Sequence, residues 1–161
     1  MPPKKAEPKN PEIASNRKAL RDFHILETIE AGIELKGTEV KSLRAGKAQL
    51  RASYARVERR QIFLHDCDIQ PYERASHEQH EPKRPRRLLL HRQEIDRLAG
   101  EVEISGRTLV ALRLYWKNGR VKVALGLGKG KADTDKRADL KKRAQDRETD
   151  RLLASIQRRG R

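Results

Sequence analysis

The stretch from Phe23 to Leu35 alternates between apolar and polar side chains. Six of its seven odd-numbered positions are apolar, and its even-numbered positions are mostly polar. Successive side chains of a β-strand point to opposite faces, so a period of two predicts a long strand with one buried face. Gly32 lies inside this run and predicts a bulge or bend. The chain is therefore expected to build a sheet.

Two predicted hairpins extend this sheet. The alternating runs 53–57 and 62–69 flank a short polar stretch, which is typical of a hairpin. Asn118-Gly119 stands between the runs 109–116 and 121–127, and this dipeptide tolerates the positive φ angles of a tight turn. About six short strands predict an antiparallel β-barrel, closed or partly open. The same periodicity also fits a small sandwich.

Three short helices are expected between the strands. The first covers Asn16–Leu20. The second covers 38–46, with Thr38 as its N-cap, and the third follows the helical spacing of apolar residues over 88–100. Val102–Ile104 predicts one additional strand.

Apolar periodicity is confined to the middle of the chain, which predicts three regions. Residues 1–15 contain four of the seven prolines and no aromatic residue, so we expect a disordered lead-in. Residues 16–128 hold all six aromatic residues and predict the folded, RNA-binding barrel. Residues 129–161 carry twelve basic and six acidic residues without a proline, and they form a basic tail.

The tail is permissive for helix but has little apolar surface to bury. Thr149, Leu152, Leu153 and Ile156 form one patch at helical spacing. Isolated short helices are marginal in water, so we expect a tail that is disordered when free and helical on a partner. The alternative is a helix docked on the barrel.

The charge balance indicates the class of partner. The chain carries 38 Lys and Arg against 23 Asp and Glu, which gives a formal net charge of +15. This excess favours a polyanion, because each cation near a phosphate releases condensed counterions. A merely soluble basic protein is the alternative. Aromatic residues make up only 4% of the chain, which favours recognition of folded RNA over stacking on single strands.

A compact basic segment lies before the second half of the predicted barrel. Lys83, Arg84, Arg86 and Arg87 surround Pro85, and the prolines in this segment keep it extended. Arg binds phosphate through two parallel hydrogen bonds and also stacks on exposed bases. A solvated loop is the alternative interpretation.

Other classes of function lack support in the sequence. No apolar run is long enough for a membrane helix, and the N-terminus has no apolar signal core, so we expect a cytoplasmic protein. Cys67 is the only cysteine, which excludes an internal disulfide and a cysteine zinc site. His77 and His80 are a weak metal motif, and 126–131 has the wrong spacing for a P-loop. We therefore expect no enzyme activity, no cofactor and no metal.

Six short blocks carry the most specific information. The longest is GTEVKSLRAG at Gly37–Gly46. The others are NRKA at 16–19, EAGI at 30–33, RRLLLH at 86–91, LYWKNG at 114–119 and DKR at 135–137. These blocks, in this order, resemble the SmpB family, the SsrA-binding proteins of bacteria, and the resemblance covers roughly residues 16 to 151.

The resemblance implies an oligonucleotide-binding-type β-barrel with small helices and a basic C-terminal tail. It implies binding to the tRNA-like domain of transfer-messenger RNA, which elongation factor Tu with GTP carries to stalled ribosomes for rescue and peptide tagging. In this family the barrel replaces the missing anticodon arm. The tail enters the vacant messenger channel near the small-subunit decoding centre and becomes helical. We expect a monomer. The alternative is a ribosome-associated structural protein or a general RNA chaperone.

The resemblance also implies which residues contact RNA. Glu30, Leu89 and Lys122 match positions on the family's RNA-binding face. Glu30 cannot attract phosphate, but its carboxylate can accept hydrogen bonds from RNA or hold a basic neighbour. With the basic loop and the exit from the last strand, the further expected RNA contacts are Asn16, Arg17, Lys18, Glu39, Lys41, Arg84, Arg86, Arg87, Lys129 and Lys131.

The tail matches the segment of the family that faces the ribosome. Thr134 stands where the family usually has Tyr or His, and Ala132 replaces a common Lys. Thr134 cannot stack on a base, an interaction worth about 1–3 kcal/mol, so tail docking is expected to differ in detail. The expected ribosome contacts are Gly130, Lys131, Asp135, Lys136, Arg137, Lys141, Lys142 and Arg143.

Overall fold

The computed structural model describes residues 11–75, 79–104 and 106–159. The chain divides into two compact units, Met1–Gly130 and Lys131–Arg161. The elements in chain order are β1 (Glu12–Ser15), α1 (Arg17–Asp22), β2 (Phe23–Ile33), α2 (Gly37–Arg44), β3 (Ala48–Gln49), β4 (Tyr54–Glu58), β5 (Gln61–His65), β6 (Asp68–Ile69), β7 (Arg86–Leu89), α3 (Arg92–Glu103), β8 (Arg107–Lys117), β9 (Arg120–Gly130) and α4 (Asp133–Arg159).

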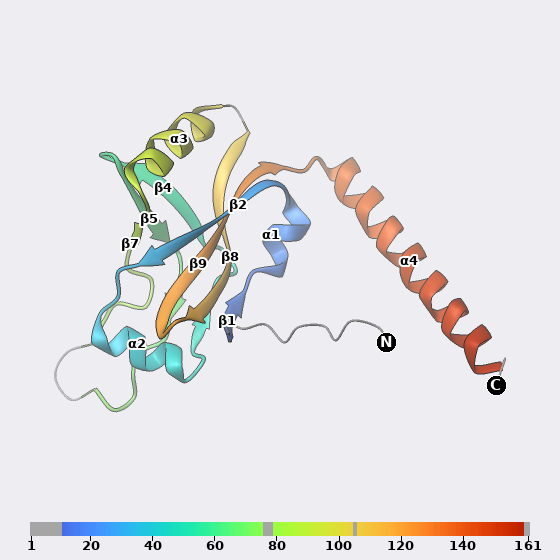
Figure 1. Ribbon diagram of the computed structural model, residues 1–161, viewed down its shortest axis with the longest axis horizontal. Helices are drawn as coiled ribbons and strands as arrows, with labels where there is room; N and C mark the ends of the chain where they lie inside the picture. Colours follow the sequence, from blue (N-terminus) through green and yellow to red (C-terminus); the bar gives the residue numbers. More distant parts are fainter. Residues whose placement is uncertain (1–10, 76–78, 105, 160–161) are drawn as a thin grey trace. The chain divides into compact units, whose positions relative to one another are not determined.

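The first unit is a closed barrel (Figure 1). Its strands follow the order β8-β4-β5-β7-β2-β9, and β9 pairs again with β8, so the sheet returns to its starting strand. Every pairing is antiparallel. Closure removes the free edges of the six-stranded ring. The predicted barrel is therefore confirmed, and the sandwich alternative is wrong.

The alternating run predicted at 23–35 forms strand β2, which contributes Ile29, Ala31 and Ile33 to the core. The predicted irregularity at Gly32 is wrong, because the register shift in β2 lies between Ile25 and Glu27. Gly32 instead allows a close approach between strands. A Cβ placed there would lie 3.1 Å from the Cβ of Leu89.

Both predicted hairpins are confirmed. The β8–β9 turn uses Asn118 and Gly119 with φ angles of 51° and 74°. The β4–β5 turn uses Arg59 and Arg60, which also have positive φ. The run expected at 62–69 is two strands, β5 and β6, rather than one.

The first predicted helix is confirmed as α1, and the other two helices need corrections. Thr38 is not the N-cap of α2, which begins after Lys36, and the Thr38 hydroxyl contacts His80 instead. Residues 88–89 belong to β7, and α3 begins only at Arg92. The strand expected at Val102–Ile104 is the last turn of α3 and its C-cap.

The N-terminal region also differs from the prediction. Residues 1–10 lie outside the described part of the chain, but Glu12–Ser15 form strand β1 instead of a disordered lead-in. This strand pairs with β8, and Ala14 lies opposite Leu114. Its half-buried residues, Ile13 and Ala14, pack against the core and supply the stabilising contact.

The second unit contains α4, a continuous helix of 27 residues. This differs from the expectation of a disordered free tail. More than half of its residues are Arg, Lys, Leu or Ala, which are strong helix formers. Leu140, Leu152, Leu153 and Ile156 are all at least half exposed. Helical propensity, rather than burial of an apolar face, therefore accounts for this helix.

None of the helices in the described ranges has both the length and the apolar character needed to cross a membrane.

Candidate nucleic-acid interface

One row of residues crosses four strands on the outer face of the barrel. Gly32 of β2 pairs with Leu89 of β7 on one side and with Lys122 of β9 on the other. Lys122 pairs in turn with Tyr115 of β8. Directly opposed residues share a face of the sheet, so the four residues of this cross-strand row lie on one face. Leu89 and Lys122 are accessible on that face, whereas Gly32 and Tyr115 are buried between them. Glu30 lies two residues before Gly32 in β2 and faces the same side.

Gly32 sets the shape of the cross-strand row. Because Gly32 has no side chain, Leu89 lies directly over the β2 backbone, 3.1 Å from an ideal Cβ position. Leu89 remains 48% exposed, whereas its neighbour Leu88 is buried in the core. A half-exposed leucine beside a cation provides an apolar contact next to a site for phosphate.

Glu30 is held by two donors from β8. The Tyr115 hydroxyl donates to Glu30 Oε2 at 2.5 Å, and Lys117 Nζ lies 3.0 Å from Oε1. The hydrogen bond from Tyr115, followed by that from Lys117, lowers the pKa of the Glu30 carboxyl. Burial and the bond to Glu30 raise the pKa of Tyr115 to about 12. At neutral pH Glu30 is therefore ionised, and it positions Tyr115 and Lys117.

Lys122 has a different environment. Within the described ranges, its ammonium makes no hydrogen bond and no ion pair, although its charge contributes to lowering the pKa of Glu30. The residue as a whole is half-buried on the sheet surface. Lys122 can therefore bind a phosphate without first breaking an internal contact.

Glu39 and Arg86 are corrections to the expected RNA contacts. Both side chains are fully buried, and Arg86 Nε donates to Glu39 Oε2 at 2.8 Å. Arg86 also donates to the carbonyl oxygens of Cys67 and Pro82 at 2.6 and 3.0 Å. Arg84 Nε donates to the other oxygen of Glu39 at 2.5 Å. This buried cluster joins α2 to β7, and neither Glu39 nor Arg86 can reach RNA.

Asn16 is a further correction. Its residue surface is only 4% exposed. The side-chain oxygen accepts from Ala19 N at 3.1 Å and caps α1, while Nδ2 donates to the carbonyl of Ala111 at 3.0 Å. These bonds use both ends of the amide. Asn16 fixes α1 on the barrel and leaves little of its side chain for RNA.

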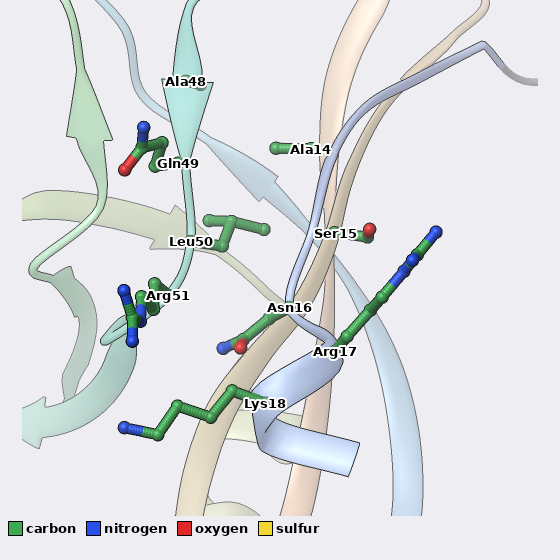
Figure 2. A pocket seen from close by; sticks show the side chains of 9 residues that line it. All are labelled: Ala14, Ser15, Asn16, Arg17, Lys18, Ala48, Gln49, Leu50 and Arg51. Carbon is green, nitrogen blue, oxygen red and sulfur yellow. The ribbon is translucent and has the colours of Figure 1, made fainter. Parts of the chain in front are cut away.

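A hollow of about 410 Å³ lies beside Asn16, between the start of α1 and the segment around β3 (Figure 2). In this view Lys18, Gln49 and Arg51 extend to one side of the hollow, whereas Arg17 extends away to the other. Lys18 and Arg17 are exposed, as expected of RNA contacts. Arg51 was not among the expected residues, because an isolated Arg gives no signal in the sequence.

The remaining cations of the barrel that were expected to contact RNA lie on three different elements. Arg87 is exposed on β7, two residues before Leu89, and so faces the same side of the sheet. Lys129 is exposed near the end of β9. Lys41 lies on α2, with its ammonium 5.4 Å from the centroid of the Tyr72 ring. Of these three, only Arg87 extends the surface formed by Leu89.

The expected ribosome contacts belong to a different part of the chain from the cross-strand row. Gly130 is the last residue of β9, and the other tail positions lie in the second unit. Lys131 forms an ion pair with Asp139. Lys141, Lys142, Arg143 and Arg137 are exposed on α4. These four cations are therefore presented along one helix.

Tyr115 and Lys117 are residues that the sequence interpretation missed. The signal was present in the predicted β8–β9 hairpin. A two-residue turn at Asn118-Gly119 pairs Lys117 with Arg120, and hence Tyr115 with Lys122. Their contact with Glu30 depends on the pairing of β2 with β9, which no local pattern reveals.

The weaker candidates for chemistry have structural explanations. His80 is buried, with its ring nitrogens 2.9 Å from Thr38 Oγ1 and 2.8 Å from the carbonyl of Ile69. His77 lies outside the described residues. Burial raises the pKa of the Cys67 thiol to about 11, so it is a poor nucleophile. Among the described residues, no group of acidic, His and Cys side chains could hold a metal ion.

Comparison with known proteins places this geometry in a family. Residues 13–155 match the SmpB protein family. The SsrA-binding protein of Geobacillus sp. (strain WCH70) is 52% identical over 146 residues, which cover 91% of this chain and 94% of that protein. The SsrA-binding protein of Corynebacterium glutamicum (strain R) is 52% identical over 150 residues, covering 93% and 92%.

A solved structure gives the same result. It is described as "tmRNA-SmpB: a journey to the center of the bacterial ribosome", and its matching chain is 52% identical with a TM-score of 0.63. The match covers 74% of this chain and 84% of that chain. This chain, with its barrel and its basic tail, therefore belongs to the SmpB family.

Proposed function

We propose that this protein is an RNA-binding adaptor of trans-translation in the bacterial cytoplasm. Its barrel binds the tRNA-like domain of transfer-messenger RNA, and the protein helps to deliver that RNA to stalled ribosomes for rescue and tagging of the nascent peptide. Elongation factor Tu with GTP is an indirect partner through the RNA. The protein acts as a monomer and performs no catalytic step itself.

The cross-strand row is the observation that carries this proposal. Leu89 and Lys122 flank Gly32 on adjacent strands, and Glu30 holds Tyr115 and Lys117 beside them. This surface combines the apolar contact of Leu89, the cation of Lys122 and the fixed carboxylate of Glu30. Such a rigid mixture suits the backbone and 2′-hydroxyls of a folded RNA better than a bare phosphate chain. The names of the SsrA-binding relatives agree with this partner.

The tail provides the second half of the proposal. Residues 129–161 are strongly basic, and α4 exposes its cations along 27 residues. A cationic helix of this kind suits a channel walled by ribosomal RNA. We propose that Gly130, Lys131, Asp135, Lys136, Arg137, Lys141, Lys142 and Arg143 contact the small subunit near the decoding centre.

Replacing Lys122 with Glu tests the assignment of the RNA face. Lys122→Glu removes a phosphate partner and places a second carboxylate near Glu30. We expect the affinity for transfer-messenger RNA to fall by about tenfold or more. The salt slope, which is the slope of log affinity against log salt concentration, should decrease by about the value of one phosphate contact. The thermal unfolding midpoint should stay close to that of the wild type. Fluorescence titrations at several salt concentrations measure both quantities.

Arg59→Glu is the matched control, because it makes the same change in charge in the β4–β5 turn. It should bind RNA nearly as well as the wild type. Equal losses in the two variants would mean that net charge, and not the cross-strand row, determines the affinity.

A further inference from the structure

We propose that a groove beside the cross-strand row receives one unstacked nucleobase of the bound RNA. This inference rests on the proposed function and adds a base-binding site to it. The groove has a volume of about 420 Å³ and lies between α1, β1 and the outer face of β8, β9 and β2. Its lining includes Glu12, Leu20, Thr28, Leu112, Arg113 and Ala124.

The groove is continuous with the proposed RNA face. Ala124 of β9 pairs with Arg113 of β8 on one side and with Glu30 of β2 on the other. Thr28 lies two residues before Glu30 and therefore faces the same side of β2. An RNA strand that contacts Glu30 and Lys122 thus passes directly beside this groove.

The floor of the groove is apolar. Leu112 and Ala124 belong to a small apolar cluster outside the barrel, in which Ala19 of α1 also packs. Leu20, on the next position of α1, is 50% exposed at the edge of the groove. Ligand pockets span roughly 300–1,000 Å³, so a groove of this volume has room for a single base. Apolar walls favour the face of a base over a phosphate.

Arg113 supplies a stacking surface. Its guanidinium carbon lies 5.6 Å from the centroid of the Tyr115 ring, and its side chain is 56% exposed. A planar guanidinium can stack on aromatic rings and on bases. Its ion pair with Glu12 is long, at 3.9 Å. Arg113 can therefore stack on a base while Glu12 accepts a hydrogen bond from an exocyclic amino group.

Folded RNA offers such a base in its loops. Bases in loops and bulges are often unstacked, and proteins bind them between aromatic or guanidinium planes. This occupant also explains how a chain with few aromatic residues reads more than the phosphate backbone. The ligand class is therefore a single purine or pyrimidine from an unpaired position.

Filling the groove tests the proposal. Thr28 is an exposed strand residue, and Thr28→Trp places a large ring in the groove without disturbing the core. We expect affinity for the tRNA-like domain of transfer-messenger RNA to fall by about tenfold. Gln61→Trp, at an exposed position of β5, is the matched control and should bind like the wild type. Thermal unfolding checks that both variants remain folded.

A second variant separates base stacking from phosphate binding. Arg113→Lys keeps the charge but loses the planar group. We expect several-fold weaker binding with an unchanged salt slope. Two results together would overturn the proposal. Arg113→Lys would bind with wild-type affinity, and Arg113→Ala would reduce the salt dependence of binding by the amount expected for one phosphate contact. The groove would then hold phosphate only.

RNA that lacks single bases completes the test. The probe is the tRNA-like domain with one abasic nucleotide at each unpaired loop position in turn. One such change should weaken binding to the wild type but have no further effect on Thr28→Trp, because coupled sites are not additive. If the loss of affinity from each abasic nucleotide adds to the loss from Thr28→Trp at every position, the groove does not bind a base. If Lys122→Glu weakens binding while Thr28→Trp does not, the base site fails and the proposed function stands.

Discussion

We expect a protein that ends at Ala132 to bind transfer-messenger RNA within about threefold of the full chain at near-physiological salt, but to support no peptide tagging on stalled ribosomes. The barrel is complete at this point, because the last pair between β2 and β9 joins Phe23 to Gly130. Residues beyond Gly130 form a separate compact unit. The small loss of affinity reflects the missing tail charges, which salt largely screens.

A charge-neutral variant shows whether the tail acts as a helix. Ala138→Pro keeps every charge and breaks α4, because proline removes a backbone donor and clashes with the preceding turn. It should bind RNA like the wild type and lose most tagging, whereas Ala138→Leu should keep both activities. A large loss of RNA affinity in the truncated protein would contradict this division of labour.

The second large effect concerns stability. Glu39→Ala should lower the free energy of unfolding by about 3–5 kcal/mol, because it leaves the fully buried guanidinium of Arg86 without its carboxylate. Arg84 loses the same partner. Chemical denaturation measures the change. Loss of RNA binding should follow only from the smaller folded fraction, since Glu39 has no surface to offer RNA.

Glu73→Ala is the control for this prediction. Glu73 also forms an ion pair, with Lys47 at 2.6 Å, but its side chain is 79% exposed. Exposed pairs contribute little to stability, so the unfolding midpoint should barely move. Similar effects of the two variants would show that the buried cluster around Glu39 is not a special source of stability.

The sequence predicted the strands whose pattern is local. Alternation identified β2, and Asn118-Gly119 identified the turn between β8 and β9, because both signals depend only on neighbouring residues. Leu88 and Leu89 were assigned to a helix, because Leu88 begins the helical spacing of residues over 88–100. Leu88 pairs with Ile62 and Ile33, which are far away in sequence, and these partners make it a strand residue. Long-range pairing overrides a local pattern.

The candidate site shows the same limit. The family resemblance supplied Glu30, Leu89 and Lys122, and the strand register shows that they share one face. Residue type alone could not separate Arg86 from Arg87. The first is fully buried against Glu39, and the second is exposed. Alternation along β7 decides between them, and that strand was not predicted.

The central claim is that the barrel face selects a tRNA-like fold and does not merely attract polyanions. A competition titration at fixed, near-physiological salt tests this most directly. Labelled transfer-messenger RNA bound to the full protein is challenged with its unlabelled form, with bulk tRNA and with an unrelated duplex RNA. We predict that only unlabelled transfer-messenger RNA competes at low concentration. Equal competition by all three would contradict the claim, because the net charge of +15 would then explain the binding, as for a general RNA chaperone.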